Sequence, residues 1–128
     1  LDLTLATVSS NLRNFSAVDL TGSGNNTLKL SQEDVLSMSG AVDNATSTGA
    51  DESKMLVING DAGGVLQLVS GRQWTQAGSG LSGAALGGAV DANAYGSSFG
   101  FVSGETYAKY TYGGATLFVD ESLLVTHL

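Results

Sequence analysis

The feature that most constrains this chain is a set of short apolar segments joined by turns rich in glycine and asparagine. Residues 17–31 and 55–69 each hold two such segments around one turn. Residues 104–120 hold two more, and residues 122–128 hold the last. Pairs of alternating segments joined by Gly or Asn turns are typical of β-hairpins. We therefore expect a mainly β protein with an antiparallel, β-sandwich-like arrangement.

The alternation also predicts where the strands lie. Residues 1–10 alternate leucine with smaller or polar residues and predict a first strand. Residues 55–58 and 65–69 are apolar on both faces, so they predict a hairpin near the centre of the sandwich. Residues 105–112 and 115–119 predict a second hairpin across a two-glycine turn.

One short helix is expected at about residues 32–38. Ser31 provides an N-cap, and the carboxylate of Asp34 at the third helical position resembles a capping box. Acidic residues in the first turn also suit the helix dipole. Gly40 is expected to end the helix after about two turns.

The chain length fits one domain, which we assign to residues 1–128 as a single β-rich module. Residues 77–104 consist almost entirely of small residues with scattered aromatic ones. We expect them to form a long glycine-rich loop or insertion. Since the first residue is Leu1, we also expect the chain to be a piece of a longer one.

Composition excludes several classes of function. The chain has no cysteine and one histidine, which leaves out disulfides, thiolate metal sites and Ser-His-Asp catalysis. A formal net charge of -7 disfavours nucleic acid and anionic membrane as partners and makes cations the natural counter-ions. No apolar run approaches the ~20 residues of a membrane span. We predict no enzymatic activity, no nucleic-acid binding and no membrane insertion.

A candidate metal site lies at Asn59 and Asp61, in a short turn flanked by glycines. Ca²⁺ takes about six to eight oxygen ligands, so backbone carbonyls or distant carboxylates such as Asp19 or Asp120 would have to contribute. The alternative is that Asn59 and Asp61 only satisfy the geometry of the turn. If calcium binds, we expect it at this turn rather than at acidic residues 43–52.

Candidate ligand-binding residues are Trp74 and Tyr95. Aromatic faces beside acidic residues are a common way to build carbohydrate sites. The alternative is that Trp74 and the alternating tyrosines fill the core and the sheet faces. Tyr95, within the glycine-rich segment, is the aromatic residue that packing explains least.

The order of four segments resembles a module of the giant RTX-type repeat adhesins. The resemblance rests on DLTGSGNNTLKLSQEDVL within residues 17–40, NGDAGG within 56–68, QWTQ within 73–78, and TYAKYTYGGATLFVD within 106–125. Proteins of this family are calcium-dependent, are exported by type I secretion, and act at bacterial surfaces and in biofilms. The resemblance therefore implies a secreted or cell-surface repeat protein whose modules build or present a ligand-binding tip.

The chain departs from that family in two places. Gly64 stands where the family often has an acidic residue, and residues 77–104 are longer than the usual connection. The calcium-binding nonapeptide GGxGxD does not occur in the sequence, so the repeat array itself lies outside this chain.

Together the residues and the resemblance predict a non-catalytic structural or adhesive module that extends or presents ligand-binding domains. Its expected partners are the neighbouring domains of the same long chain, and carbohydrate or a host or biofilm surface. The alternative is a calcium-assisted carbohydrate- or peptide-binding module. A hydrolase is disfavoured because no base is available to activate a nucleophile.

Overall fold

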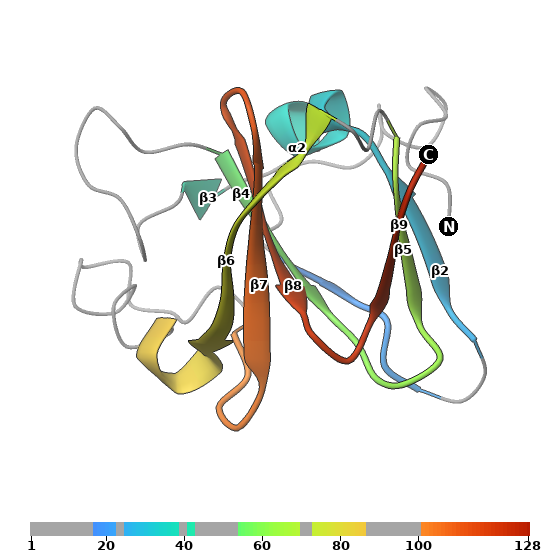
Figure 1. The fold of residues 1–128 in the computed structure, drawn as a ribbon, viewed down its shortest axis with the longest axis vertical. Coiled ribbons are helices and arrows are strands. Elements are labelled where there is room, and N and C mark those ends of the chain that lie inside the picture. Colours follow the sequence, from blue (N-terminus) through green and yellow to red (C-terminus); the bar gives the residue numbers. More distant parts are fainter. Residues whose placement is uncertain (1–16, 23–24, 39–40, 43–53, 70–72, 87–100) are drawn as a thin grey trace.

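The described part of the molecule consists of two β-sheets that face each other (Figure 1). The computed structural model describes residues 17–22, 25–38, 41–42, 54–69, 73–86 and 101–128. The expected first strand at residues 1–10 lies outside these ranges.

The larger sheet has the strand order β1-β4-β8-β7-β6, with β3 beside β4. Its strands are β1 (Ala17–Asp19), β3 (Ala41–Val42), β4 (Lys54–Asn59), β6 (Thr75–Ser82), β7 (Thr106–Tyr112) and β8 (Ala115–Asp120). The smaller sheet has the order β2-β5-β9. Its strands are β2 (Thr27–Leu30), β5 (Val65–Leu68) and β9 (Leu124–His127).

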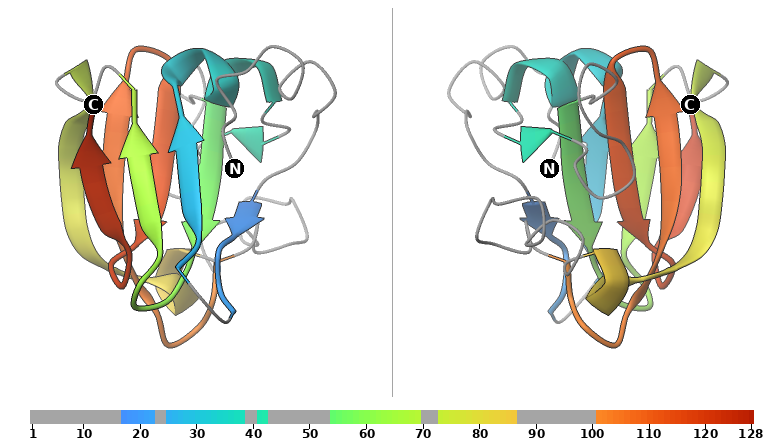
Figure 2. Two further views of the ribbon diagram at one scale, coloured as in Figure 1. Left: turned by 90° about the vertical axis from the view of Figure 1, so that its right-hand side faces the viewer. Right: turned by 90° about the vertical axis from the view of Figure 1, so that its left-hand side faces the viewer.

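Three times in the described ranges the chain leaves the large sheet, turns, and enters the small sheet. We call each such unit an arch: arch 1 is residues 17–30, arch 2 is 54–68 and arch 3 is 115–127. The arches stack in parallel, as the aligned arrows of Figure 2 show. In the large sheet Val18 lies beside Ile58, which lies beside Val119. Equivalent positions of the three arches therefore form ladders.

The prediction of a mainly β protein is confirmed, but the prediction of antiparallel pairing is only partly right. The hairpin between residues 105–112 and 115–119 is present as β7 and β8, with Tyr112 opposite Ala115 and Gly113 at φ 57°. The hairpin predicted between 55–58 and 65–69 is wrong, because these segments lie in different sheets.

Arches replace the predicted hairpins because each apolar strand pairs with the equivalent strand of the next arch. The turn of arch 2 is longer than a two-residue hairpin loop, and the side chain of Leu123 packs against Gly60 and Gly64 within it. β4 and β8 are buried on both faces, as expected for residues 55–58, whereas β5 is buried on one face only.

The predicted helix is confirmed as α2 (Gln32–Met38). The Asp34 carboxylate accepts hydrogen bonds from the Ser31 N–H and hydroxyl at 2.7 Å, which is the predicted capping arrangement. The Gln32 side-chain amide donates to the Tyr112 carbonyl at 2.8 Å and ties the helix to the β7-β8 hairpin. Gly40, the expected helix end, lies outside the described ranges.

The prediction of a loop over 77–104 is wrong for its first part. Residues 75–82 form strand β6, which pairs with β7, and residues 83–86 form a helical turn. Small residues bury little surface, but an edge strand needs only backbone bonds to one neighbour, and β6 is accordingly exposed along most of its length. Residues 87–100 lie outside the described ranges.

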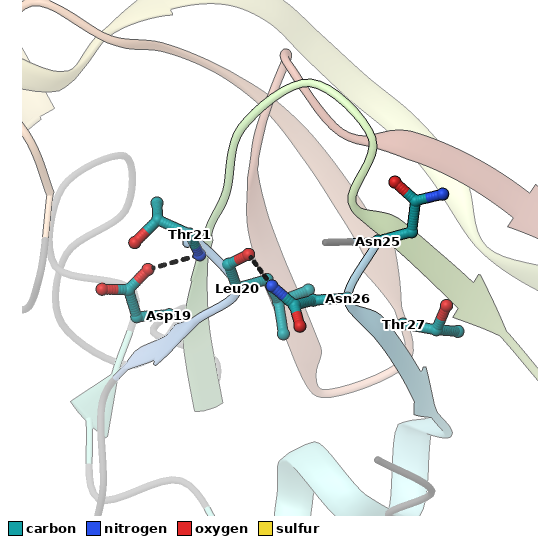
Figure 3. Close-up of a pocket in the computed structure, with 6 residues that line it drawn as sticks. All are labelled: Asp19, Leu20, Thr21, Asn25, Asn26 and Thr27. Atoms are coloured by element: carbon teal, nitrogen blue, oxygen red, sulfur yellow. Dashed lines mark hydrogen bonds between the residues drawn. The ribbon is translucent and has the colours of Figure 1, made fainter. Parts of the chain in front are cut away.

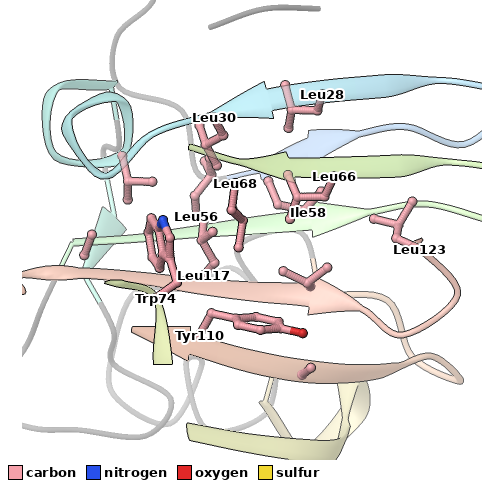
Figure 4. Packing of buried hydrophobic residues seen from close by; sticks show 14 of the residues in the cluster. Leu28, Leu30, Leu56, Ile58, Leu66, Leu68, Trp74, Tyr110, Leu117 and Leu123 are labelled. Carbon is pink, nitrogen blue, oxygen red and sulfur yellow. The ribbon is translucent and has the colours of Figure 1, made fainter. Parts of the chain in front are cut away.

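Most of the core lies between the two sheets and is built from aliphatic side chains (Figure 4). Its fully buried members include Leu28, Leu30, Leu56, Ile58, Leu66, Leu68 and Leu117. A second cluster covers the opposite face of the large sheet and comprises Met55, Val57, Leu86, Phe101, Tyr107 and Phe118. The large sheet is therefore covered by apolar side chains on both faces.

Candidate functional site

The candidate site lies where the three arches leave the large sheet. β1 ends at Asp19, β4 at Asn59 and β8 at Asp120. Asp19 lies directly beside Asn59, and the pairing of Ile58 with Val119 places Asp120 next in the same ladder. The parallel stack therefore brings together three polar residues that are far apart in the sequence.

The two aspartates of this ladder shape the turns that follow them. The Asp19 carboxylate accepts the Thr21 N–H at 2.8 Å, and the Asp120 carboxylate accepts the Ser122 N–H at 2.9 Å. Such bonds across two residues are the usual way in which aspartate starts a turn. Hydrogen bonds from the side chain and backbone of Thr21 hold the pKa of Asp19 below its ordinary value.

Asn59 is held by a buried tyrosine from the β7 strand. The Tyr107 hydroxyl donates to the Asn59 side-chain oxygen, and it accepts the Val102 N–H at 2.9 Å. Burial raises the pKa of Tyr107, and the nearby charges of Asp120 and Glu105 raise it further. Tyr107 therefore stays protonated at neutral pH and keeps donating to Asn59.

Asp61 points into the neighbouring arch instead of toward Asn59. Its carboxylate accepts the Gly22 N–H at 3.2 Å, and the Val65 N–H donates to the Asn26 carbonyl close by at 2.8 Å. The predicted pair of Asn59 and Asp61 is thus divided between two tasks: Asn59 bonds to Tyr107, and Asp61 ties the turn of arch 1 to that of arch 2.

A polar hollow of about 490 Å³ opens at the turn of arch 1 (Figure 3). It is lined by Asp19, Leu20, Thr21, Asn25, Asn26 and Thr27. The Asn26 side-chain amide donates to the Leu20 carbonyl at 3.0 Å and holds the two sides of the turn together. The carboxylate, hydroxyl and amide groups of the residues that line the hollow can bind either a cation or a ligand rich in hydroxyl groups.

The sequence singled out only Asp19 from this hollow, as a distant carboxylate that could assist a calcium site. Thr21, Asn25 and Asn26 were not singled out, because in a turn such residues are equally expected for backbone reasons. The repeated pattern of Asp or Asn at the end of an apolar segment, at 19, 59 and 120, is the signal that could have located this edge.

The residues at this edge fit calcium only in part. Within the described ranges, no three acidic or histidine side chains lie close enough together to hold one metal ion. Asp19 and Asp61 each use one carboxylate oxygen to accept a backbone N–H. A calcium ion here would therefore need backbone carbonyls and side-chain amide oxygens, such as that of Asn25, to complete its oxygen shell.

Trp74 lies in the core, which corrects its assignment as a ligand-binding residue. Its side chain is buried and packs edge-to-face against Tyr112, with ring centroids 5.7 Å apart. The indole face is therefore covered by the protein, and the alternative of core packing is the one that the structure supports (Figure 4). The Trp74 Nε1–H has no acceptor among the described residues. Tyr95, the other predicted ligand residue, lies outside the described ranges.

These features define a mainly β protein in which stacked parallel arches present a polar edge. No protein-family model, curated protein or solved structure matches the chain. None of the helices in the described ranges has the length and apolar character needed to cross a membrane.

Proposed function

We propose that this chain is a non-catalytic, sandwich-like structural module of a large secreted or cell-surface bacterial repeat protein. Its role is to extend or present neighbouring ligand-binding domains of the same chain. The sequence resemblance to RTX-type adhesin modules supports the location and the kind of protein.

The observation that carries the proposal is the parallel stack of arches. Each arch pairs with the arch next to it, and positions such as Val18, Ile58 and Val119 repeat in register. Proteins whose units contact only their neighbours extend in one direction and are typically used as scaffolds and binding surfaces. The turns that join the sheets are fixed by Asp19, Asp61 and Asp120, which act here as structural residues.

A glycan array combined with a folding control tests this proposal. A scaffold module should leave the array blank while its far-UV circular dichroism shows a folded β protein. Binding to defined glycans by the folded protein, in the presence or absence of calcium, would overturn the scaffold role.

Calcium is proposed as the stabilising counter-ion of the polar edge. An ion that binds only the folded state raises its stability by mass action. The wild type should then melt at a higher temperature in calcium than in EDTA. Asp61→Asn keeps an acceptor for the Gly22 N–H but removes a charge, so it should reduce this difference while its melting temperature in EDTA stays close to that of the wild type.

The matched control for Asp61→Asn is Glu33→Gln, which removes the same charge from the exposed first turn of α2. It should keep the full calcium effect. Equal melting temperatures of the wild type in calcium and in EDTA would show that the edge holds no stabilising ion and that Asp61 acts only through Gly22.

A second candidate function is calcium-assisted binding of carbohydrate, which the polar hollow of arch 1 favours. Asp19, Thr21 and Asn25, which carry carboxylate, hydroxyl and amide groups, all line the hollow of about 490 Å³. If this function is correct, Asn25→Ala should abolish glycan binding and leave the melting temperature nearly unchanged. Glycan binding that survives this substitution would place the ligand elsewhere.

A further inference from the structure

The two sheets do not end at the same place on the side of arch 3. The small sheet ends at β9, whereas the large sheet continues beyond β8 with β7 and β6. The inward side of β7 next to β8 carries Ala108 and Tyr110, which belong to the core between the sheets. Beyond β9, the described part of the small sheet supplies no further strand to cover β7 and β6.

The backbone of β9 is arranged to accept another strand. Leu124 N–H donates to the Gly64 carbonyl at 3.0 Å, and Leu128 N–H donates to the Leu68 carbonyl at 2.9 Å. Backbone groups of successive strand residues point to opposite sides, so Val125 directs its N–H and C=O away from β5. A strand edge of this kind is a template for pairing with another extended segment.

A groove of about 260 Å³ runs beside this edge. Ala108, Tyr110, Val119 and Leu123 line it but are at most 9% exposed. Its accessible apolar surface therefore comes mainly from Leu124 and the half-buried Val125. Leu124, which also lines the groove, is 61% exposed. A segment paired with β9 would place alternate side chains against this apolar surface and the others in solvent.

One end of the groove is acidic. Glu121 lines it and is exposed, with one carboxylate oxygen accepting the Gly80 N–H at 2.8 Å. Asp120 is 2% exposed and lies opposite Tyr107, on the other face of the large sheet, so Glu121 supplies the accessible charge. No lysine or arginine lines the groove. The net charge of -7 on the whole chain also favours a positively charged partner. A second copy of this chain would bring a second set of acidic residues to the groove, whereas a basic segment would compensate the charge.

We propose that β9 and the groove beside it bind an extended basic peptide of a partner protein by strand addition. Main-chain bonds to the Val125 side of β9 give affinity, apolar side chains pack beside Leu124 and Val125, and a Lys or Arg meets Glu121. This site goes beyond the proposed scaffold role, and its test uses a different readout from those of glycan and calcium binding.

The probe is the synthetic peptide acetyl-Lys-Val-Thr-Val-Thr-Lys-amide, compared with the same peptide carrying Glu in place of Lys. Lysine at both ends permits binding in either strand direction. Calorimetric titration should show that the acidic peptide binds at least about tenfold more weakly. Amide NMR shifts caused by the basic peptide should centre on residues 124–127 and 108–110.

Substitutions then separate the edge from the rest of the surface. Val125→Pro removes a donor that faces outward, so it should weaken peptide binding about tenfold or more and leave the pairing with β5 intact. Thr126→Pro, one residue further, removes a donor on the β5 side and should lower the melting temperature instead. Glu121→Gln keeps the acceptor for Gly80 and should weaken binding severalfold, while Glu33→Gln should not change it.

Three outcomes would overturn the proposal. The first is a wild type that does not bind the basic peptide. The second is binding that neither Val125→Pro nor Glu121→Gln weakens. The third is a dimer in sedimentation that Val125→Pro dissociates, because a second copy would then occupy the edge. If Val125→Pro fails to fold, Glu121→Gln and the NMR map still decide the outcome.

Discussion

At the scale of single residues, the packing of Leu123 requires glycine at positions 60 and 64. An added Cβ would lie 2.2 Å from a terminal carbon of Leu123 at Gly60, and 2.5 Å from the same carbon at Gly64. Leu123 itself is 7% exposed and belongs to the core between the sheets. The glycines of the second turn therefore serve close packing between arch 2 and arch 3.

Gly60→Ala should lower the free energy of unfolding by about 1–3 kcal/mol, because the added methyl group displaces Leu123 from a packed site. In a Leu123→Ala background the same substitution should cost much less, since the obstructing carbons are gone. Urea unfolding of the four proteins in this double-mutant cycle measures the coupling.

Gly78→Ala is the control for this cycle. Its Cβ would lie 3.5 Å from the nearest atom, at an ordinary contact distance. A Gly60→Ala penalty that is unchanged in the Leu123→Ala background would contradict this account of the turn.

Tyr107 makes the free energy of unfolding depend on pH in the alkaline range. Tyr107→Phe should cost about 1–3 kcal/mol, since it leaves the Asn59 oxygen and the Val102 N–H without their shared hydroxyl. Because the pKa of Tyr107 is raised above its ordinary value of 10.0, its contribution is complete below that pH and is lost as pH rises. Burial and the charge of Glu121 raise the pKa of Tyr110 as well.

Unfolding curves measured from pH 8 to pH 12 check this prediction. The wild type should lose stability above about pH 10, and Tyr107→Phe should lose less over the same interval. Parallel curves for the two proteins would show that Tyr107 does not carry the alkaline loss.

At the scale of secondary-structure elements, α2 depends on its cap and on one side-chain bond. Ser31→Ala removes the hydroxyl that bonds to Asp34 and should cost about 1 kcal/mol. The exposed residue Glu33 provides the control, because Glu33→Gln changes the same turn without touching the cap. Thermal or urea unfolding measures the stability of both variants. Equal stability of the two would contradict the role of the cap.

The sequence predicted elements that local chemistry determines, and it missed pairings that are set at a distance. The cap of α2 and the Gly113-Gly114 hairpin follow from residues next to each other. Residues 55–58 and 65–68 lie in different sheets because they pair with β8 and β9, which no local pattern reveals. Strand β6 was missed because glycine and serine supply no apolar alternation, and its pairing depends on β7.

The same reasoning explains the result for the candidate site. Asp19, Asn59 and Asp120 were each visible in the sequence as polar residues at segment ends. That they lie close together in space follows only from the parallel register of β1, β4 and β8. Trp74 was ambiguous because an indole suits a ligand platform and a core equally well.

At the scale of the whole molecule, stability should be greatest in the middle of the arch stack. β4 and β8 each have strands on both sides and are covered on both faces, whereas β6 is an exposed edge. Native-state hydrogen exchange should therefore show the slowest amides in β4 and β8 and the fastest strand amides in β6. Equal protection of β6 and β8 would contradict a stability gradient across the large sheet.

The parallel stacking of arches also has a kinetic consequence. Ala17 must find Val57, and Val57 must find Phe118, before either ladder can form. Contacts so distant along the chain are reached only after long loops have closed, so the protein should fold slowly for its length. Arch 1 and arch 2 also resemble each other in length and pattern, so at high concentration an arch of one molecule can take the place of its counterpart in another. Refolding from dilute solution should therefore give the monomer, and refolding from concentrated solution should give exchanged dimers.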